Sequence, residues 1–115
     1  MESGIKLNKE IANLIIKLCL SINELKKYCK SHDKEKHICF KNYEDIKNKM
    51  DEILRATNTR AMLIKIKELQ GFTKSSLKLY KVFPIDYGGR DQTLQTLKVI
   101  ENRLKILGKL ISHQL

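Results

Sequence analysis

Apolar residues between positions 11 and 29 recur at alternating spacings of four and three residues, the pattern of one face of a helix. The residues of this stripe are Ile11, Ile15, Leu18, Ile22, Leu25 and Cys29. Asn8 is expected to cap the helix, because its side-chain oxygen can accept a hydrogen bond from a free amide of the first turn. Ile16 and Leu20 widen the stripe, which predicts a helix buried on more than one side, at the centre of a bundle.

The middle of the chain predicts two shorter helices separated by a turn. After a polar break over residues 31–41, Asn42 is expected to cap a helix. The inner face of that helix is predicted to contain Ile46, Met50 and Ile53. Residues 56–59 (Ala-Thr-Asn-Thr) favour helix weakly, which predicts a kink or a short turn. The next helix is expected to end near Gly71, a residue suited to a helix C-cap. Its predicted inner face contains Ala61, Ile64 and either Leu63 or Ile66.

The last part of the chain predicts a short helix, a loop and a long helix. Thr73 is expected to cap the short helix, and Pro84 to end it. Its apolar residues are Leu77, Tyr80 and Val82. Residues 85–90 contain two adjacent glycines and predict a loop, after which Asp91 caps the last helix. The apolar stripe of that helix is Leu94, Leu97, Ile100, Leu104, Leu107 and Ile111. The pattern predicts an all-α bundle of about five helices, with long first and last helices.

Composition agrees with a single helical-bundle domain over residues 1–115. Hydrophobic residues make up 42% and charged residues 31% of the chain, which is typical of a globular protein. One proline and five glycines leave few turns and favour long helices. No apolar run approaches the ~20 residues of a membrane span, and residues 1–9 have no signal-peptide core. We therefore expect a soluble intracellular protein of the nucleus or cytoplasm, with its three cysteines reduced.

The net charge of +10 comes from 23 lysines and arginines against 13 acidic residues. Residues 42–70 are nearly neutral, with six basic and five acidic side chains, so the excess lies toward the two ends of the sequence. A positive field of this size attracts nucleic acid, anionic lipid or acidic protein segments. The alternative is that the lysine content reflects an AT-rich genome and serves no binding role.

The segment Cys29-x2-His32-x4-His37-x-Cys39 has the residue types that bind zinc. The last two ligands are too close together to occupy two corners of a tetrahedron easily, and the segment lacks glycines that would let a short loop wrap a metal. A polar loop between helices, with each cysteine completing an apolar face, is the preferred interpretation, and a Cys29–Cys39 disulfide is a further alternative. We expect no metal and no cofactor.

Catalytic motifs are not found in the sequence. It has no Gly-x-Ser-x-Gly turn, and Gly88-Gly89 lacks the Gly-Lys-Ser/Thr of a phosphate loop. Asp51 and Glu52 are adjacent and would point apart on a helix, and His113 is expected to be a cation at a helix end. We therefore expect a protein that is not an enzyme.

The basic residues offer the best candidate for a binding surface. Lys74, Lys78 and Lys81 follow spacings of four and three, so they share one helix face. Phe72 and the loop residues Ile85 and Arg90 are expected to border this strip. In the last helix, basic residues fall between the apolar positions: Lys98, Arg103, Lys105 and Lys109. An ordinary solvated helix face is the alternative interpretation.

Residues 60–83 resemble part of the TFIIS N-terminal and integrase-binding-domain type of helical docking domain. The resemblance rests on a helix that ends in a leucine, an apolar residue followed by a threonine, a leucine four residues later and an apolar residue that closes the turn. In this chain these residues are Leu69, Phe72, Thr73, Leu77 and Val82. Tyr80-Lys81-Val82-Phe83 stands where the family tends to have Thr-x-Ile-Gly. The resemblance implies a bundle of four or five helices that binds disordered segments in which acidic residues flank a bulky apolar anchor.

We therefore expect an interaction module that docks an acidic protein segment or assembles into a larger homo- or hetero-oligomeric complex, with a role related to transcription. The alternative is a nucleic-acid-binding protein that contacts phosphates through lysine-rich helix faces. Seven aromatic residues and no tryptophan leave little for base stacking, which favours the protein segment.

Overall fold

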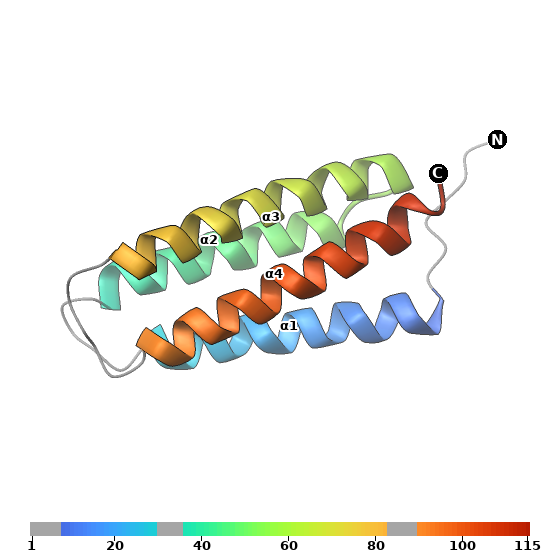
Figure 1. Ribbon diagram of the computed structural model, residues 1–115. Coiled ribbons are helices and arrows are strands. Elements are labelled where there is room, and N and C mark those ends of the chain that lie inside the picture. Colours follow the sequence, from blue (N-terminus) through green and yellow to red (C-terminus); the bar gives the residue numbers. More distant parts are fainter. Residues whose placement is uncertain (1–7, 30–35, 83–89) are drawn as a thin grey trace.

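A computed structural model of the chain describes residues 8–29, 36–82 and 90–115. These residues form four helices, α1 (Lys9–Cys29), α2 (Lys36–Leu54), α3 (Thr59–Val82) and α4 (Arg90–Ser112). Successive helices run in opposite directions along a shared axis (Figure 1). Each helix contacts two neighbours, so the four form a ring in which α4 lies between α3 and α1. The all-α class is confirmed, and the expected number of about five helices is wrong.

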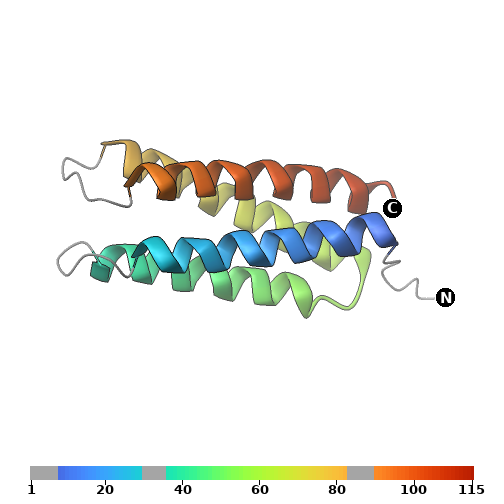
Figure 2. The ribbon, with the colours of Figure 1, turned by 90° about the horizontal axis from the view of Figure 1, so that it is seen from below.

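The bundle is long and narrow, with extents of 52 × 21 × 19 Å. Viewed from below, α1 lies between α4 on one side and α2 on the other (Figure 2). One cluster of buried apolar residues runs through it. The fully buried members of that cluster, which come from all four helices, are Tyr80, Ile11, Leu18, Leu25, Ile46, Ile53, Ile66, Leu69, Leu97, Ile100, Leu104, Leu107 and Ile111. The inner faces predicted for the first, second and last helices are therefore confirmed in outline.

The α1 stripe is narrower than its apolar residues predict. Asn8 caps the helix, since its side-chain oxygen accepts a hydrogen bond of 2.8 Å from the Ile11 amide. Ile16 and Leu20, which were expected to be buried, are 56% and 59% exposed. In a ring of four helices none is central, so α1 buries one face and leaves the opposite one uncovered.

The break between α2 and α3 is confirmed, but the start of α2 is not. Asn58 caps α3 by accepting a 2.8 Å hydrogen bond from the Ala61 amide. Asn42 does not cap α2, because that helix begins six residues earlier, at Lys36. The side-chain amide of Asn42 instead donates a 2.8 Å hydrogen bond to the Ser76 hydroxyl and so links α2 to α3.

The predicted break at Gly71 is wrong, because α3 continues through it for 24 residues. Thr73, expected to be a cap, is fully buried in the helix interior, and its hydroxyl donates to the Leu69 carbonyl oxygen at 2.8 Å. The Ser76 hydroxyl donates to the Phe72 carbonyl oxygen at 3.0 Å in the same way. A threonine or serine whose hydroxyl bonds to a carbonyl oxygen of its own helix can lie in the helix interior and does not mark a helix end. One helix therefore replaces the predicted pair.

The predicted inner face of α3 needs correction as well. Ile64 is 53% exposed, and Ala61 is only half-buried. Leu63 and Ile66 were alternatives for the third residue of that face, and Ile66 is fully buried whereas Leu63 is half-buried. The buried face of α3 is Thr59, Met62, Ile66, Leu69, Thr73, Ser76, Leu77 and Tyr80. In α4 the predicted stripe is buried except for the half-buried Leu94, and Asp91 lies in the first turn rather than before it.

Candidate functional site

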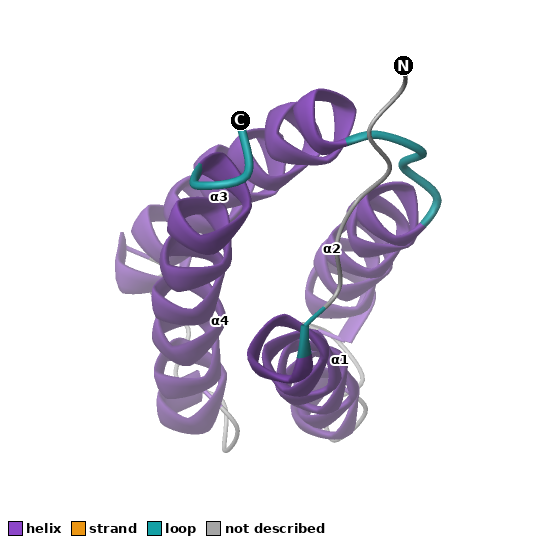
Figure 3. Ribbon diagram, turned by 90° about the vertical axis from the view of Figure 1, so that its right-hand side faces the viewer, coloured by secondary structure: helices purple, strands orange, loops and turns teal. Residues whose placement is uncertain are grey.

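Most of the net positive charge belongs to two neighbouring helices. The α3 sequence has six basic residues and one acidic residue, and α4 has five basic and two acidic. Together they account for +8 of the net +10. The α1 sequence has four basic and two acidic residues, and α2 has four of each. Because α3 and α4 lie side by side (Figure 3), the charge that is spread along the sequence is concentrated on one side of the bundle.

Four exposed lysines form a stripe along α3. Lys67, Lys74, Lys78 and Lys81 are separated by seven, four and three residues, which keeps them on one side of a regular helix. Gly71 is exposed and occupies the remaining position of this series, four residues after Lys67. A β-carbon added at Gly71 would meet no atom within 4 Å. The stripe is thus interrupted once, by a residue without a side chain.

A second stripe lies on α4, where Lys98, Lys105 and Lys109 are exposed and separated by seven and four residues. Two hollows of about 260 Å³ each lie between α3 and α4. One is lined by Gln70, Lys74, Glu101, Asn102 and Lys105. The other is lined by Leu63, Lys67, Gln70, Lys105, Gly108, Lys109 and Ser112. Since they share Gln70 and Lys105, they form one groove, called the α3–α4 groove below.

The α3–α4 groove is almost entirely positive. Four of its lining residues are lysines, and Glu101 is the one carboxylate among them. The ion pairs in which both residues are described join Lys65 to Glu52 at 3.0 Å and to Glu68 at 3.6 Å. Lys67, Lys74, Lys105 and Lys109 therefore have no carboxylate partner among the described residues. Beyond the hollows, the antiparallel helices continue toward Lys78 on α3 and Lys98 on α4.

The structure does not bring all the predicted site residues together. Phe72 lies two positions from Lys74, which on a helix is a rotation of about 200°. Its half-buried ring faces α2, where the Lys49 ammonium lies 5.4 Å from the ring centroid. Ile85 lies outside the described residues, and Arg90 begins α4 with a side chain that is not described. Of the predicted set, the three lysines share one face and Phe72 does not.

The zinc candidates also fall outside the described side chains. Cys29 ends α1, and His37 and Cys39 lie in the first turns of α2, but their side chains are not described. His32 lies between the two helices, in residues 30–35. Among the described residues, no three His, Cys, Asp or Glu side chains form a group that could hold a metal ion.

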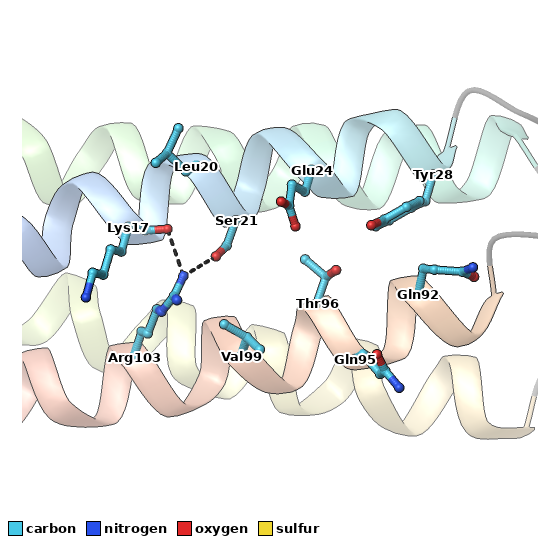
Figure 4. A pocket seen from close by; sticks show the side chains of 10 residues that line it. All are labelled: Lys17, Leu20, Ser21, Glu24, Tyr28, Gln92, Gln95, Thr96, Val99 and Arg103. Atoms are coloured by element: carbon cyan, nitrogen blue, oxygen red, sulfur yellow. Dashed lines mark hydrogen bonds between the residues drawn. The ribbon is translucent and has the colours of Figure 1, made fainter.

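A larger hollow, which the sequence did not indicate, lies between α1 and α4 and has a volume of about 430 Å³. Its lining comes from both helices (Figure 4): Lys17, Leu20, Ser21, Glu24, Tyr28, Gln92, Gln95, Thr96, Val99 and Arg103. The Arg103 guanidinium donates hydrogen bonds to the Ser21 hydroxyl and, at 3.1 Å, to the Lys17 carbonyl oxygen. Placing Leu20 in the core concealed this hollow. The polar Lys17, Ser21 and Glu24, spaced by four and three, were the available signal.

Among the described residues, the titratable groups with shifted pKa values lie outside all three hollows. Burial, and then the negative charge of Asp51, raise the pKa of the half-buried Cys19 thiol. A thiol held in its protonated form is a poor nucleophile. A hydrogen bond and an ion pair with Lys65 lower the pKa of Glu52, and the same contacts raise the pKa of Lys65. These shifts belong to a surface ion pair and to a half-buried thiol packed against the core.

Within the described residues, no helix combines the length and the apolar character needed to cross a membrane. Comparisons of the chain with protein-family models, curated protein sequences and solved structures find no match. The resemblance of residues 60–83 to the TFIIS-type docking domains therefore stays a prediction. The helix end at Leu69 and the Thr73 cap, on which it partly rested, are replaced by the continuous α3 helix.

Proposed function

We propose that the protein is a non-enzymatic interaction module that binds an acidic protein segment along the α3–α4 groove. The observation that carries the proposal is the pair of lysine stripes, seven exposed lysines on two adjacent helices with Glu101 as the one carboxylate lining the groove. Each contact between an exposed lysine and a carboxylate contributes about 0.2–1 kcal/mol. Several such contacts are needed for useful affinity, and a segment lying along the groove can make them together.

The form of the groove supports a protein segment as its occupant. Two hollows of about 260 Å³ can receive side chains that project from an extended or helical segment. Leu63 and Gly108 give one hollow an apolar part, which suits a bulky apolar residue between acidic ones. No aromatic residue lines either hollow, so the described groove offers no platform for stacking bases.

Nucleic acid is the second candidate, and the length of the α3 stripe supports it. Lys67 to Lys81 spans 14 residues of helix, about 21 Å at 1.5 Å per residue. A row of cations of this length can follow a phosphate backbone without reading its sequence. The affinity for DNA would then fall steeply with salt. The logarithm of the binding constant decreases linearly with the logarithm of the salt concentration, with a slope close to the number of phosphates contacted.

The test compares three probes by fluorescence anisotropy. The first is a short peptide of Asp and Glu residues flanking one Phe, the second is the same peptide with Ala in place of Phe, and the third is random-sequence duplex DNA. The groove variant is Lys74→Glu/Lys105→Glu. The matched control is Lys41→Glu/Lys47→Glu, which changes the net charge equally at two exposed lysines of α2. Circular dichroism verifies that both variants stay helical.

We expect the Phe peptide to bind more tightly than the Ala peptide, and the groove variant to lose that binding while the control variant keeps most of it. An equal loss in both variants would show attraction to net charge alone and would refute a specific groove. Tighter binding of DNA than of either peptide, lost in the groove variant only, would favour the second candidate.

A further inference from the structure

The side of α1 that borders the α1–α4 hollow carries a pattern of charges that is complementary to the same pattern on a second, antiparallel α1 helix. Lys17 and Glu24 are separated by seven residues, so they lie on the same side of the helix about 10.5 Å apart along its axis. Leu20 and Ser21 lie midway between them. Figure 4 shows Lys17, Ser21 and Glu24 following one another along α1 beside α4.

Neither charge has an ionic partner within the described residues; the ion pairs found between two of those residues join Lys65 to Glu52 and to Glu68. The apolar residues around them are also uncovered. Leu20 is 59% exposed and Val99 40% exposed, and both line the α1–α4 hollow. Ile16, one turn before Leu20, is 56% exposed. Exposed apolar residues grouped beside two opposite charges are typical of an interface rather than of a solvated face.

We infer that this side of α1 binds a second copy of the chain about a two-fold axis that passes between Leu20 and Ser21. In that arrangement the two α1 helices run antiparallel, and Lys17 of each copy faces Glu24 of the other. The contact is self-complementary, as a two-fold interface requires. The two Leu20 side chains lie next to the axis, where each enters the hollow of about 430 Å³ between α1 and α4 of the opposite copy.

The distribution of charge favours the same face. The α1 sequence has a net charge of +2, whereas α3 has +5. Two copies that meet through α1 therefore bring together one of the less charged sides of the bundle and leave the lysine stripe of α3 facing outward. A contact through α3 would oppose two rows of lysines and would be repulsive. This inference does not depend on the role proposed for the α3–α4 groove.

Sedimentation equilibrium over a range of protein concentrations tests the inference. We expect the wild type to associate from 13.4 kDa to twice that mass. Leu20→Glu should abolish association, because it places two carboxylates beside the axis. The control is Ile64→Glu, which makes the same change at a residue of α3 with a similar exposure of 53% and should leave the dimer intact. Both sites are exposed, so circular dichroism should show both variants folded.

Charge-reversal variants of Lys17 and Glu24 test the orientation of the two copies. Lys17→Glu or Glu24→Lys alone should each weaken the dimer about tenfold, because two symmetric attractions become repulsions. The double variant Lys17→Glu/Glu24→Lys should restore wild-type association, because the two partners simply exchange signs. A monomer at every concentration, a dimer that Leu20→Glu leaves intact, or a double variant no better than the single ones would each overturn the inference.

Discussion

The continuity of α3 through Gly71 predicts that Gly71→Ala stabilises the protein. The position is exposed, lies in a helix interior and has no positive φ, and an added β-carbon meets no atom within 4 Å. The change therefore brings no clash and no new packing. What remains is the difference in helix propensity, about 0.8–1.0 kcal/mol in favour of alanine. Part of it arises in the unfolded chain, where alanine has fewer conformations to lose.

The expected gain of roughly 0.5–1 kcal/mol can be measured. With an unfolding entropy of about 2.1 cal/mol/K per residue, it raises Tm by roughly 2–4 °C for 115 residues. Urea unfolding followed by far-UV circular dichroism gives the free energy directly, with an unchanged slope if both states keep their exposed surface. Gly108→Ala serves as comparison, because it also lies in a helix interior and its added β-carbon would meet Ile66 Cγ2 at an ordinary 3.5 Å.

The sign of the effect decides between two structures of this segment. If a helix ended at Gly71, the glycine would take the left-handed conformation of a C-cap, and alanine there would cost about 1–2 kcal/mol. A loss of stability in Gly71→Ala, with a gain in Gly108→Ala, would therefore refute a continuous α3.

Three further predictions concern the other contacts of α3. Ile66→Ala should lower the free energy of unfolding by about 2–5 kcal/mol because the side chain is fully buried. Ile64→Ala should lower it by less than about 1 kcal/mol, because Ile64 is 53% exposed. Urea unfolding of both variants tests which side of α3 is buried. Asn58→Ala should cost about 1 kcal/mol by removing the cap on the Ala61 amide, with Asn58→Asp retaining most of the stability in the same assay. Lys65 lowers the pKa of Glu52, so its contribution to stability is present above the ordinary carboxyl pKa and is lost as the pH falls through the lowered value. Glu52→Gln should therefore reduce the acid sensitivity of thermal unfolding, and an unchanged pH profile would show that the pair contributes nothing.

The periodicity of apolar residues was enough to predict the buried face of a helix wherever that helix buries a single side. The α4 stripe and the α2 face of Ile46, Met50 and Ile53 were correct because each helix buries a single side in the ring. The same reasoning failed at Ile16 and Leu20. A sequence shows how wide an apolar surface is, but the number of helices that cover it depends on the assembled bundle.

The segment around Gly71 was misinterpreted because two of its residues suit two environments. Glycine is tolerated inside a helix at modest cost, and threonine can bond its own helix as well as cap the next one. Burial decided between these for Thr73, whose hydroxyl reaches the Leu69 carbonyl oxygen. Burial depends on contacts from distant parts of the chain, so local sequence could not supply it.

The sequence predicted the grouping of lysines on α3 but not their position beside the lysines of α4. Lys74, Lys78 and Lys81 were grouped correctly on one face because the spacing rule needs one helix only. Lys67 had been assigned to a separate helix, so the stripe appeared shorter than it is. The partner stripe on α4 was noticed, but its place beside α3 follows from the order of helices around the ring, which no motif in the sequence encodes.

The bond network of Arg103 has a consequence for how the chain folds. Contacts between α1 and α2, α2 and α3, and α3 and α4 join helices that follow one another, whereas the contact between α1 and α4 joins the first to the last. Arg103 and the Lys17 carbonyl oxygen that it binds are 86 residues apart in sequence. Closing so long a loop is entropically slow, so this contact should form after the helical hairpins. Loosening it through Arg103→Ala should then leave the refolding rate nearly unchanged and speed unfolding.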